Sequence, residues 1–152
     1  MAERFTAAGY ATAAFLNNPW LGKSDLGKGF RVYEVYSRAP DEDVLAAGLE
    51  WIESPREQPF LAWIHLLDPH APYSRRAGSA IFYESGYEGH YSEEALSYGM
   101  PLAVHDEREL DRIRDPYDGE VRYVDELFGR LIDRLTVLGL MGSTSVVATA
   151  DH

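Results

Sequence analysis

The sequence contains no cysteine, which excludes disulfide bonds, thiolate metal sites and a cysteine nucleophile from its 152 residues. It has no apolar run of the roughly 18 residues that a membrane helix needs. Positive charge is scarce, because 14 Lys and Arg stand against 25 Asp and Glu, for a net charge of −11. We therefore expect no nucleic-acid partner and no membrane segment in this chain. A small anionic substrate remains compatible with this charge if a bound cation supplies local positive charge.

The composition is that of a folded protein. Hydrophobic residues make up 45% of the chain and aromatic residues 12%, which argues against disorder. A chain of this length is also long enough to bury a core. We expect one globular unit.

The most informative stretch is residues 59–73, which read PFLAWIHLLDPHAPY. Its first half is apolar except for His65, a pattern typical of a parallel strand covered on both faces, and we predict a central strand there. The strand ends in a proline-fixed turn that carries His70. Because ligands bind beyond the carboxyl ends of parallel strands, His70 is the first residue that we interpret as functional. The alternative is a histidine that only hydrogen-bonds its own turn.

For His65 we favour a structural role in the core over a functional one. It lies inside an apolar strand, where a buried histidine that satisfies its hydrogen bonds within the core is the commoner case. The alternative is a histidine that supports the neighbouring site. The sequence predicts a core role.

Familiar start and stop signals place the elements that precede this strand. We predict a helix over residues 3–8 that ends at Gly9, and strands over residues 10–16 and 31–36. A further helix is expected from an aspartate cap, Asp41 or Asp43, to a point before Pro55. The order of strand, helix and strand indicates a crossover with parallel pairing. Residues 74–104 have no steady period, and we expect an irregular insertion there.

The strongest helix signal lies in the last third of the chain. Asp115 is placed as an N-cap and Pro116 at the first helical position, and apolar residues then recur at spacings of three and four up to Gly139. The preceding acidic residues 106–111 are interpreted as a helix start or a solvated face. We expect an amphipathic helix that covers a sheet.

A second polar pair ends the chain. Residues 145–150, SVVATA, are predicted as a strand that leads into Asp151 and His152. Parallel geometry would bring this pair to the same sheet edge as Asp68 and His70. Carboxylate and imidazole groups there suit a divalent cation or acid–base chemistry on a bound ester.

Several segments together resemble the sulfatase family of the alkaline phosphatase superfamily. The matching segments are GYATAAFLNNPWL followed by GKGF, PFLAWIHLLDPHAPY, YDGEVRYVDELFGRLIDRLTVLGL and SVVATADH. The resemblance covers essentially the whole chain and implies that residues 1–152 are a partial sulfatase domain. Members of that family fold as a large α/β/α sandwich with a mostly parallel sheet, so we expect an incomplete α/β/α sandwich. They hydrolyse sulfate esters with a calcium or magnesium ion beside a formylglycine.

The resemblance also implies roles for individual residues. Position by position, Asp151 and His152 would bind the metal and His70 would contact the sulfate group of a small sulfate-ester substrate. The family signature for the formylglycine, Cys or Ser, any residue, Pro, any residue, Arg, does not occur in this sequence. We therefore expect the formylglycine in a segment before this chain. The chain would then be a fragment of a sulfatase-type hydrolase, and inactive alone.

One segment departs from the family pattern. Many members have Gly-Lys-Trp-His after the first strand seen here, where this sequence has Asn-Asn-Pro-Trp at residues 17–20. Lys23 and Lys28 are near, but nothing aligns either with the family lysine. The roles of that lysine and histidine are therefore assigned to no residue here.

Two other functions stay open. The same superfamily contains phosphoester hydrolases and phosphoglycerol transferases, and Asp and His ligands at this edge serve phosphate esters as well as sulfate esters. A cysteine in the family signature would favour a sulfatase, whereas threonine or an unmodified serine would favour phosphoryl chemistry. A non-catalytic, degenerate domain would keep the fold and lack a nucleophile even in the full gene.

Overall fold

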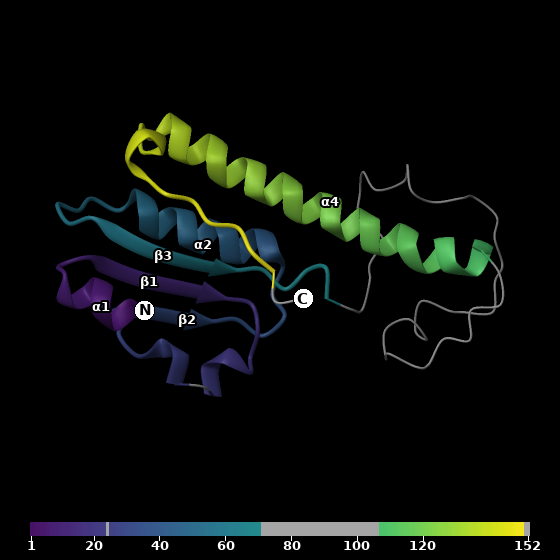
Figure 1. Cartoon of the computed structure of the whole chain (residues 1–152), viewed down its shortest axis with the longest axis horizontal. Coiled ribbons are helices and arrows are strands. Elements are labelled where there is room, and N and C mark those ends of the chain that lie inside the picture. Colours follow the sequence, from purple (N-terminus) through teal and green to yellow (C-terminus); the bar gives the residue numbers. More distant parts are fainter. Residues whose placement is uncertain (24, 71–106, 151–152) are drawn as a thin grey trace.

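The computed structural model describes residues 1–23, 25–70 and 107–150, and they form parallel strands flanked by helices (Figure 1). The strands are β1 (Ala11–Leu16), β2 (Val32–Val35) and β3 (Phe60–His65). The helices are α1 (Ala2–Ala7), α2 (Asp41–Glu53) and α4 (Glu107–Val137), with 3₁₀ turns η1 (Leu21–Lys23), η2 (Asp25–Gly27) and η4 (Met141–Ser143). The predicted α/β class with a parallel sheet is confirmed. The irregular insertion predicted for residues 74–104 lies outside the described residues.

The three strands are all parallel, in the order β2-β1-β3. Leu16 at the end of β1 pairs with Val35 of β2 on one side and His65 of β3 on the other. The central strand of the described sheet is therefore β1, and the prediction that β3 is central was wrong for the described residues. An apolar run shows that both faces of a strand are covered, but it does not show how many strands pair with its edges.

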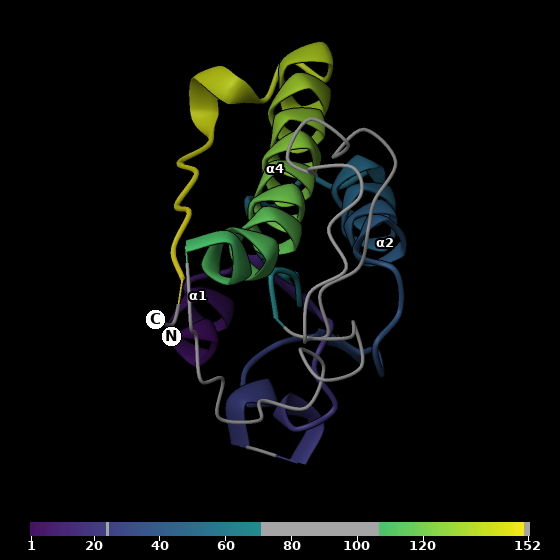
Figure 2. The same ribbon diagram turned by 90° about the vertical axis from the view of Figure 1, so that its right-hand side faces the viewer.

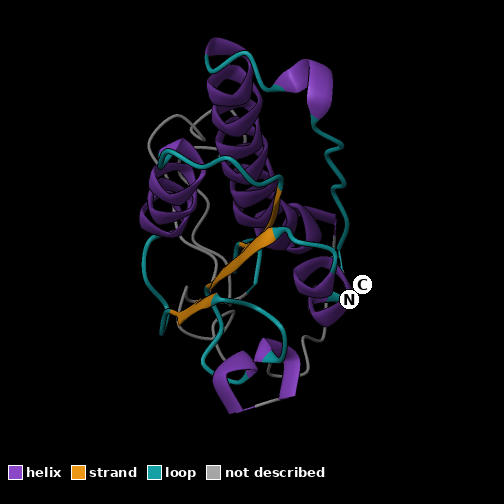
Figure 3. Cartoon of the chain, turned by 90° about the vertical axis from the view of Figure 1, so that its left-hand side faces the viewer, coloured by secondary structure: helices purple, strands orange, loops and turns teal. Residues whose placement is uncertain are grey.

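Helix α2 covers one face of this sheet and α1 the other, as Figure 3 shows. Ala13, Phe15 and Val44 form the buried centre on the α2 face. The apolar residues packed around it are Val32, Tyr36, Ala39, Ala47, Trp51, Ile64 and Leu66. Because α2 carries its apolar residues on one stripe, it packs against β1 and β3.

On the opposite face a hydrogen-bonded cluster joins α1 to the sheet. The hydroxyl groups of Thr6 and Thr12 both donate to the carbonyl of Gly29, at 2.6 and 3.0 Å. Gly29 has a φ of +89°, and a Cβ at this position would lie 2.2 Å from the backbone nitrogen of Glu3. The glycine therefore lets the loop before β2 approach the first turn of α1.

Two helices end as the sequence predicts, at glycines with positive φ. Gly9 has a φ of +88°, and the Tyr10 N–H donates to the Phe5 carbonyl at 3.0 Å. The rings of Phe5 and Tyr10 also meet edge to face, with centroids 5.0 Å apart. This is the Schellman arrangement. Gly139, with a φ of +69°, ends α4 in the same way.

The predicted start of α4 was wrong. The helix begins at Glu107, so Pro116 lies inside it rather than at its first position. Proline in a helix interior removes one hydrogen bond, but the segment before it is rich in Glu, Arg and Leu, which are strong helix formers. The predicted amphipathic face is present, with Leu127 and Leu135 buried, and α4 lies beside α2 (Figure 2). No helix among the described residues is long and apolar enough to cross a membrane.

The strand predicted for residues 145–150 is also absent from the described sheet. These residues have no strand partner among the described residues, and Val147 is 86% exposed. They run as an extended segment from the end of α4 toward the side on which β1 and β3 end (Figure 1). The local pattern favoured a strand, but a strand also needs a neighbour with which to pair.

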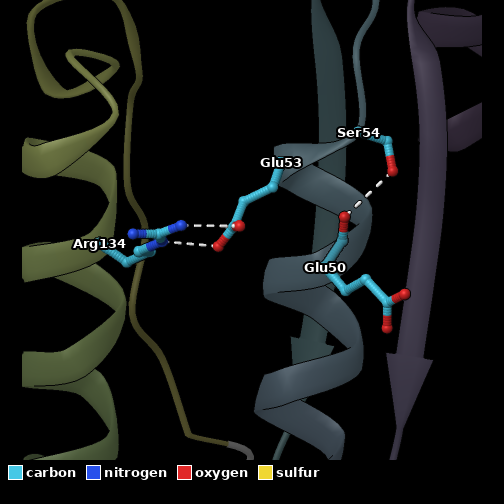
Figure 4. Close-up of polar contacts among 4 residues, drawn as sticks. All are labelled: Glu50, Glu53, Ser54 and Arg134. Carbon is cyan, nitrogen blue, oxygen red and sulfur yellow. Dashed lines mark hydrogen bonds and ion pairs between the residues drawn. The ribbon is translucent and has the colours of Figure 1, made fainter.

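An ion pair connects α4 to α2. The guanidinium of Arg134 donates to both carboxylate oxygens of Glu53, at 2.6 and 2.8 Å (Figure 4). Hydrogen bonding to Arg134 lowers the pKa of Glu53 below its ordinary value. A lowered carboxyl pKa in the folded state stabilises the fold at pH values above the ordinary pKa, and this contribution is lost as the pH falls through the folded pKa.

The variant Glu53→Gln is therefore expected to melt at a lower temperature than the unaltered chain at pH 7. The difference should shrink as the pH falls from the ordinary glutamate pKa through the lowered pKa of Glu53 in the folded state, because the wild-type carboxylate then becomes protonated. Glu50→Gln is the matched control, since Glu50 lies in the same helix and its carboxylate points away from Arg134 (Figure 4). Thermal melts across this pH range test the prediction. An equal loss of melting temperature in both variants at pH 7 would contradict it.

Candidate functional site

The candidate site lies at the carboxyl edge of the sheet. Because all three strands are parallel, the segments that follow them leave the sheet on the same side (Figure 1). In open α/β sheets this edge is where ligands bind. The segments contribute Asn17 after β1, Asp41 after β2, and residues 67–70 after β3.

A buried carboxylate joins these three segments. The side chain of Asp41 is 1% exposed and accepts hydrogen bonds from the Leu67 N–H, at 2.9 Å to each oxygen, and from the Asp68 N–H at 2.9 Å. The amide of Asn17 donates to the same carboxylate at 2.5 Å. Both carboxylate oxygens therefore have N–H donors, which compensates for their loss of water.

The amide of Asn17 is itself fully used. Its nitrogen also donates to the Ala39 carbonyl at 2.7 Å, and its oxygen accepts the Ala39 N–H at 3.0 Å. The backbone N–H of Asn17 donates to the carbonyl of His65 at 3.0 Å. Asn17 thus fixes the end of β1 to both neighbouring segments.

The turn after β3 is short and closed. The His70 N–H donates to the Leu67 carbonyl at 3.0 Å, and the peptide bond between Asp68 and Pro69 is cis. A four-residue turn with cis-proline at its third position is a type VI turn. The turn leaves the side chain of His70 exposed at the carboxyl edge of the sheet. The structure therefore places His70 where the sequence predicted it.

His65 has surroundings that differ from those of a satisfied core histidine. It is half-buried at the end of β3, and its ring lies edge to face with Trp63 at a centroid distance of 6.5 Å. Its Nδ1 atom is buried and has no hydrogen-bond partner among the described residues. The favoured interpretation, a core histidine with satisfied hydrogen bonds, therefore does not describe His65.

The two predicted metal ligands, Asp151 and His152, lie outside the described residues. The chain leads toward the carboxyl edge of the sheet as far as Ala150. Within residues 1–23, 25–70 and 107–150, no three His, Asp or Glu side chains gather closely enough to hold a metal ion. Asp41 does not supply a ligand, since N–H donors occupy both of its oxygens. The metal prediction thus depends on Asp151 and His152 rather than on the described residues.

The loop after β1 places an aromatic ring and a cation together. Trp20 is 71% exposed, and the ammonium group of Lys23 lies 4.6 Å from the centroid of its ring. Lys28 is instead paired with Asp25 at 2.7 Å. Neither lysine is brought to His70 by a contact that the structure describes.

Sequence reasoning missed the roles of Asn17 and Asp41. The sequence offered Asp41 as an N-cap of α2, but the cap position is Pro40 and no side chain caps that helix end. Asp41 is the first helical residue, and its carboxylate bonds across to the end of β3. One signal was available in the sequence, since Asn17 is a polar residue directly after an apolar strand. The sequence does not show that the Asn17 amide contacts Asp41.

Comparison with known proteins gives one match. The family model described as Sulfatase matches residues 1–152, the whole chain. Neither the curated proteins nor the solved structures contain a significant match to this sequence.

Proposed function

Because the chain belongs to the sulfatase family, we propose that it is part of a metal-dependent sulfuric ester hydrolase in which His70 contacts the sulfate group. The observation that carries this proposal is the family match over residues 1–152. The exposed position of His70 beyond the carboxyl end of β3 supports its role. The substrate is a small sulfate ester.

An imidazole suits this contact for a chemical reason. A ring N–H of His70 can donate to a sulfate oxygen, and the donor is stronger when the ring is protonated. The side chain reaches solvent from a turn whose backbone is bonded to the rest of the site. His70 can therefore bind and orient the ester without a large movement of the backbone.

Asp151 and His152 are proposed as metal ligands. Carboxylate oxygen and imidazole nitrogen are common ligands of divalent cations, and calcium and magnesium both favour oxygen. A cation bound there would polarise the sulfate oxygens. The approach of residues 144–150 toward the carboxyl edge supports this assignment.

The test is an assay of the whole protein to which this chain belongs, using an aryl sulfate and the matching aryl phosphate. The proposal expects turnover of the sulfate, its loss on chelation of divalent cations, and its return when calcium or magnesium is added back. Preferential turnover of the phosphate would instead support phosphoester chemistry. Turnover of neither ester by metal-loaded protein would support a non-catalytic domain.

A further inference from the structure

We propose that Asp41 is a positioning residue that holds the turn bearing His70, with Asn17 as its partner. The importance of that turn for turnover rests on the function proposed above. The hydrogen bonds themselves are independent of it. Together, Asn17 and Asp41 join the three segments that leave the carboxyl ends of β1, β2 and β3.

The first observation is the buried carboxylate of Asp41. Asp41 is 1% exposed, and burying a carboxylate is costly unless it is well bonded. Its three donors come from two segments. Asn17, directly after β1, donates through its side-chain amide, and the turn after β3 donates through the backbone N–H groups of Leu67 and Asp68. Charge-assisted bonds of this kind are stronger than neutral ones. These hydrogen bonds offset the cost of burying the carboxylate, and they hold the turn in place relative to α2 and β1.

The second observation is where those bonds act. Leu67 donates its N–H to Asp41 and accepts the N–H of His70 with its carbonyl. One residue therefore separates the buried carboxylate from the backbone of His70. A displacement of about 1 Å at a positioning group can lower turnover by about 100-fold, so a shift of Leu67 would be felt at His70.

Stabilisation of the α2 N-terminus does not account for this arrangement. No side chain caps that end of α2. The carboxylate of Asp41 accepts hydrogen bonds from the backbone of the turn after β3 rather than from its own helix. Two other acidic residues, Glu42 and Asp43, already lie in the first turn of α2, where they favour the helix dipole. The charge at Asp41 is thus used across the sheet edge.

The decisive variant is Asp41→Asn, which keeps the shape of the side chain and removes its charge and one acceptor. The matched control is Asp43→Asn, an exposed carboxylate two residues further along the same helix. If Asp41→Asn fails to fold, Asn17→Ala serves as the second variant, because it removes one donor to the carboxylate and leaves the bonds from Leu67 and Asp68 in place. All variants are made in the whole protein.

Amide hydrogen exchange is the first readout. Exchange at Leu67 and Asp68 is expected to become about 10- to 100-fold faster in Asp41→Asn, as loss of bonds to a charged acceptor predicts. Asp43→Asn should leave it unchanged, and Asn17→Ala should give a smaller increase. Unchanged protection of both amides in Asp41→Asn would overturn the proposal.

The second readout separates positioning from general stability. Asp41→Asn is expected to lower kcat/KM for an aryl sulfate by about tenfold or more, and to lower it no further in a protein that already carries His70→Ala. An additive loss in the double variant would show that Asp41 acts by some route other than His70 and would overturn the inference.

The two readouts also separate this inference from the proposed function. If His70→Ala leaves turnover unchanged, the proposed role of His70 fails, and the exchange rates of Leu67 and Asp68 alone then decide whether Asp41 holds the turn. If His70→Ala lowers turnover while Asp41→Asn changes neither turnover nor exchange, the function stands and the positioning role fails.

Discussion

Replacement of His70 by alanine is expected to lower kcat/KM of the whole protein for an aryl sulfate by about 100-fold or more, the usual cost of removing one hydrogen-bond donor to developing charge. The donor lies on an exposed side chain beyond the end of β3. If the contact strengthens in the transition state, the loss appears mainly in kcat. The measurement is steady-state kinetics on the purified variant.

The control for this prediction is His70→Gln. The glutamine amide keeps an N–H donor of similar reach, so a smaller loss than in His70→Ala is expected. Because His70 is exposed, neither variant should change the free energy of unfolding by more than about 0.5 kcal/mol, the usual effect of a surface substitution. Equal activity of the alanine variant and the unaltered protein would rule out the contact.

Gly29→Ala is expected to be the most destabilising single substitution among the glycines described here. Its φ of +89° disfavours any side chain by about 1–3 kcal/mol. The new Cβ would also overlap the backbone of Glu3, which cannot move like a flexible side chain, at a further cost of about 1–3 kcal/mol. Denaturant unfolding should therefore show a loss of about 2–6 kcal/mol.

Two other glycines separate these contributions. Gly9 has nearly the same φ, +88°, but a Cβ there would meet no atom within 4 Å, so Gly9→Ala should show only the conformational cost. Gly142 has neither a positive φ nor a close neighbour, and Gly142→Ala should change stability by no more than about 0.5 kcal/mol. The expected order of destabilisation is Gly29, Gly9, Gly142. A loss at Gly29 no larger than that at Gly9 would show that α1 does not pack as described.

Local signals in the sequence predicted several elements well. The strand at β1, the helix at α2 and the helix ends at Gly9 and Gly139 follow from apolar periodicity and from the need for a left-handed residue after a helix. Each of these features depends on residues close together in the sequence. Local physics is sufficient for them.

Other features were less predictable, and for two reasons. The start of α4 was placed at Pro116 because the cap and proline signals were given more weight than the helix-forming residues before it, which extend the helix to Glu107. The strand predicted over residues 145–150 has no partner among the described residues, and the place of β3 in the sheet depends on which strands pair with its edges. These two strand features depend on distant partners and cannot be read from a window of a few residues.

In the candidate site, too, the feature set by neighbouring residues was predicted and the one set by distant residues was not. His70 was predicted from its place after an apolar strand, and the structure puts it at the sheet edge. Asp41 was interpreted as a helix cap, because the bonds that give it another role join residues 26 and 27 positions apart. A carboxylate near a helix start has two uses, and only the packed structure distinguishes them. The roles of Asp151 and His152 stay predictions.

Contact between His70 and the sulfate group can be observed by nuclear magnetic resonance of the whole protein during titration with inorganic sulfate. The imidazole signals of His70 are assigned by comparison with His70→Ala, and those of His65 serve as an internal reference. The His70 signals are expected to shift and saturate with added sulfate, more strongly than those of His65. Unshifted His70 signals at sulfate concentrations that inhibit ester turnover would contradict it.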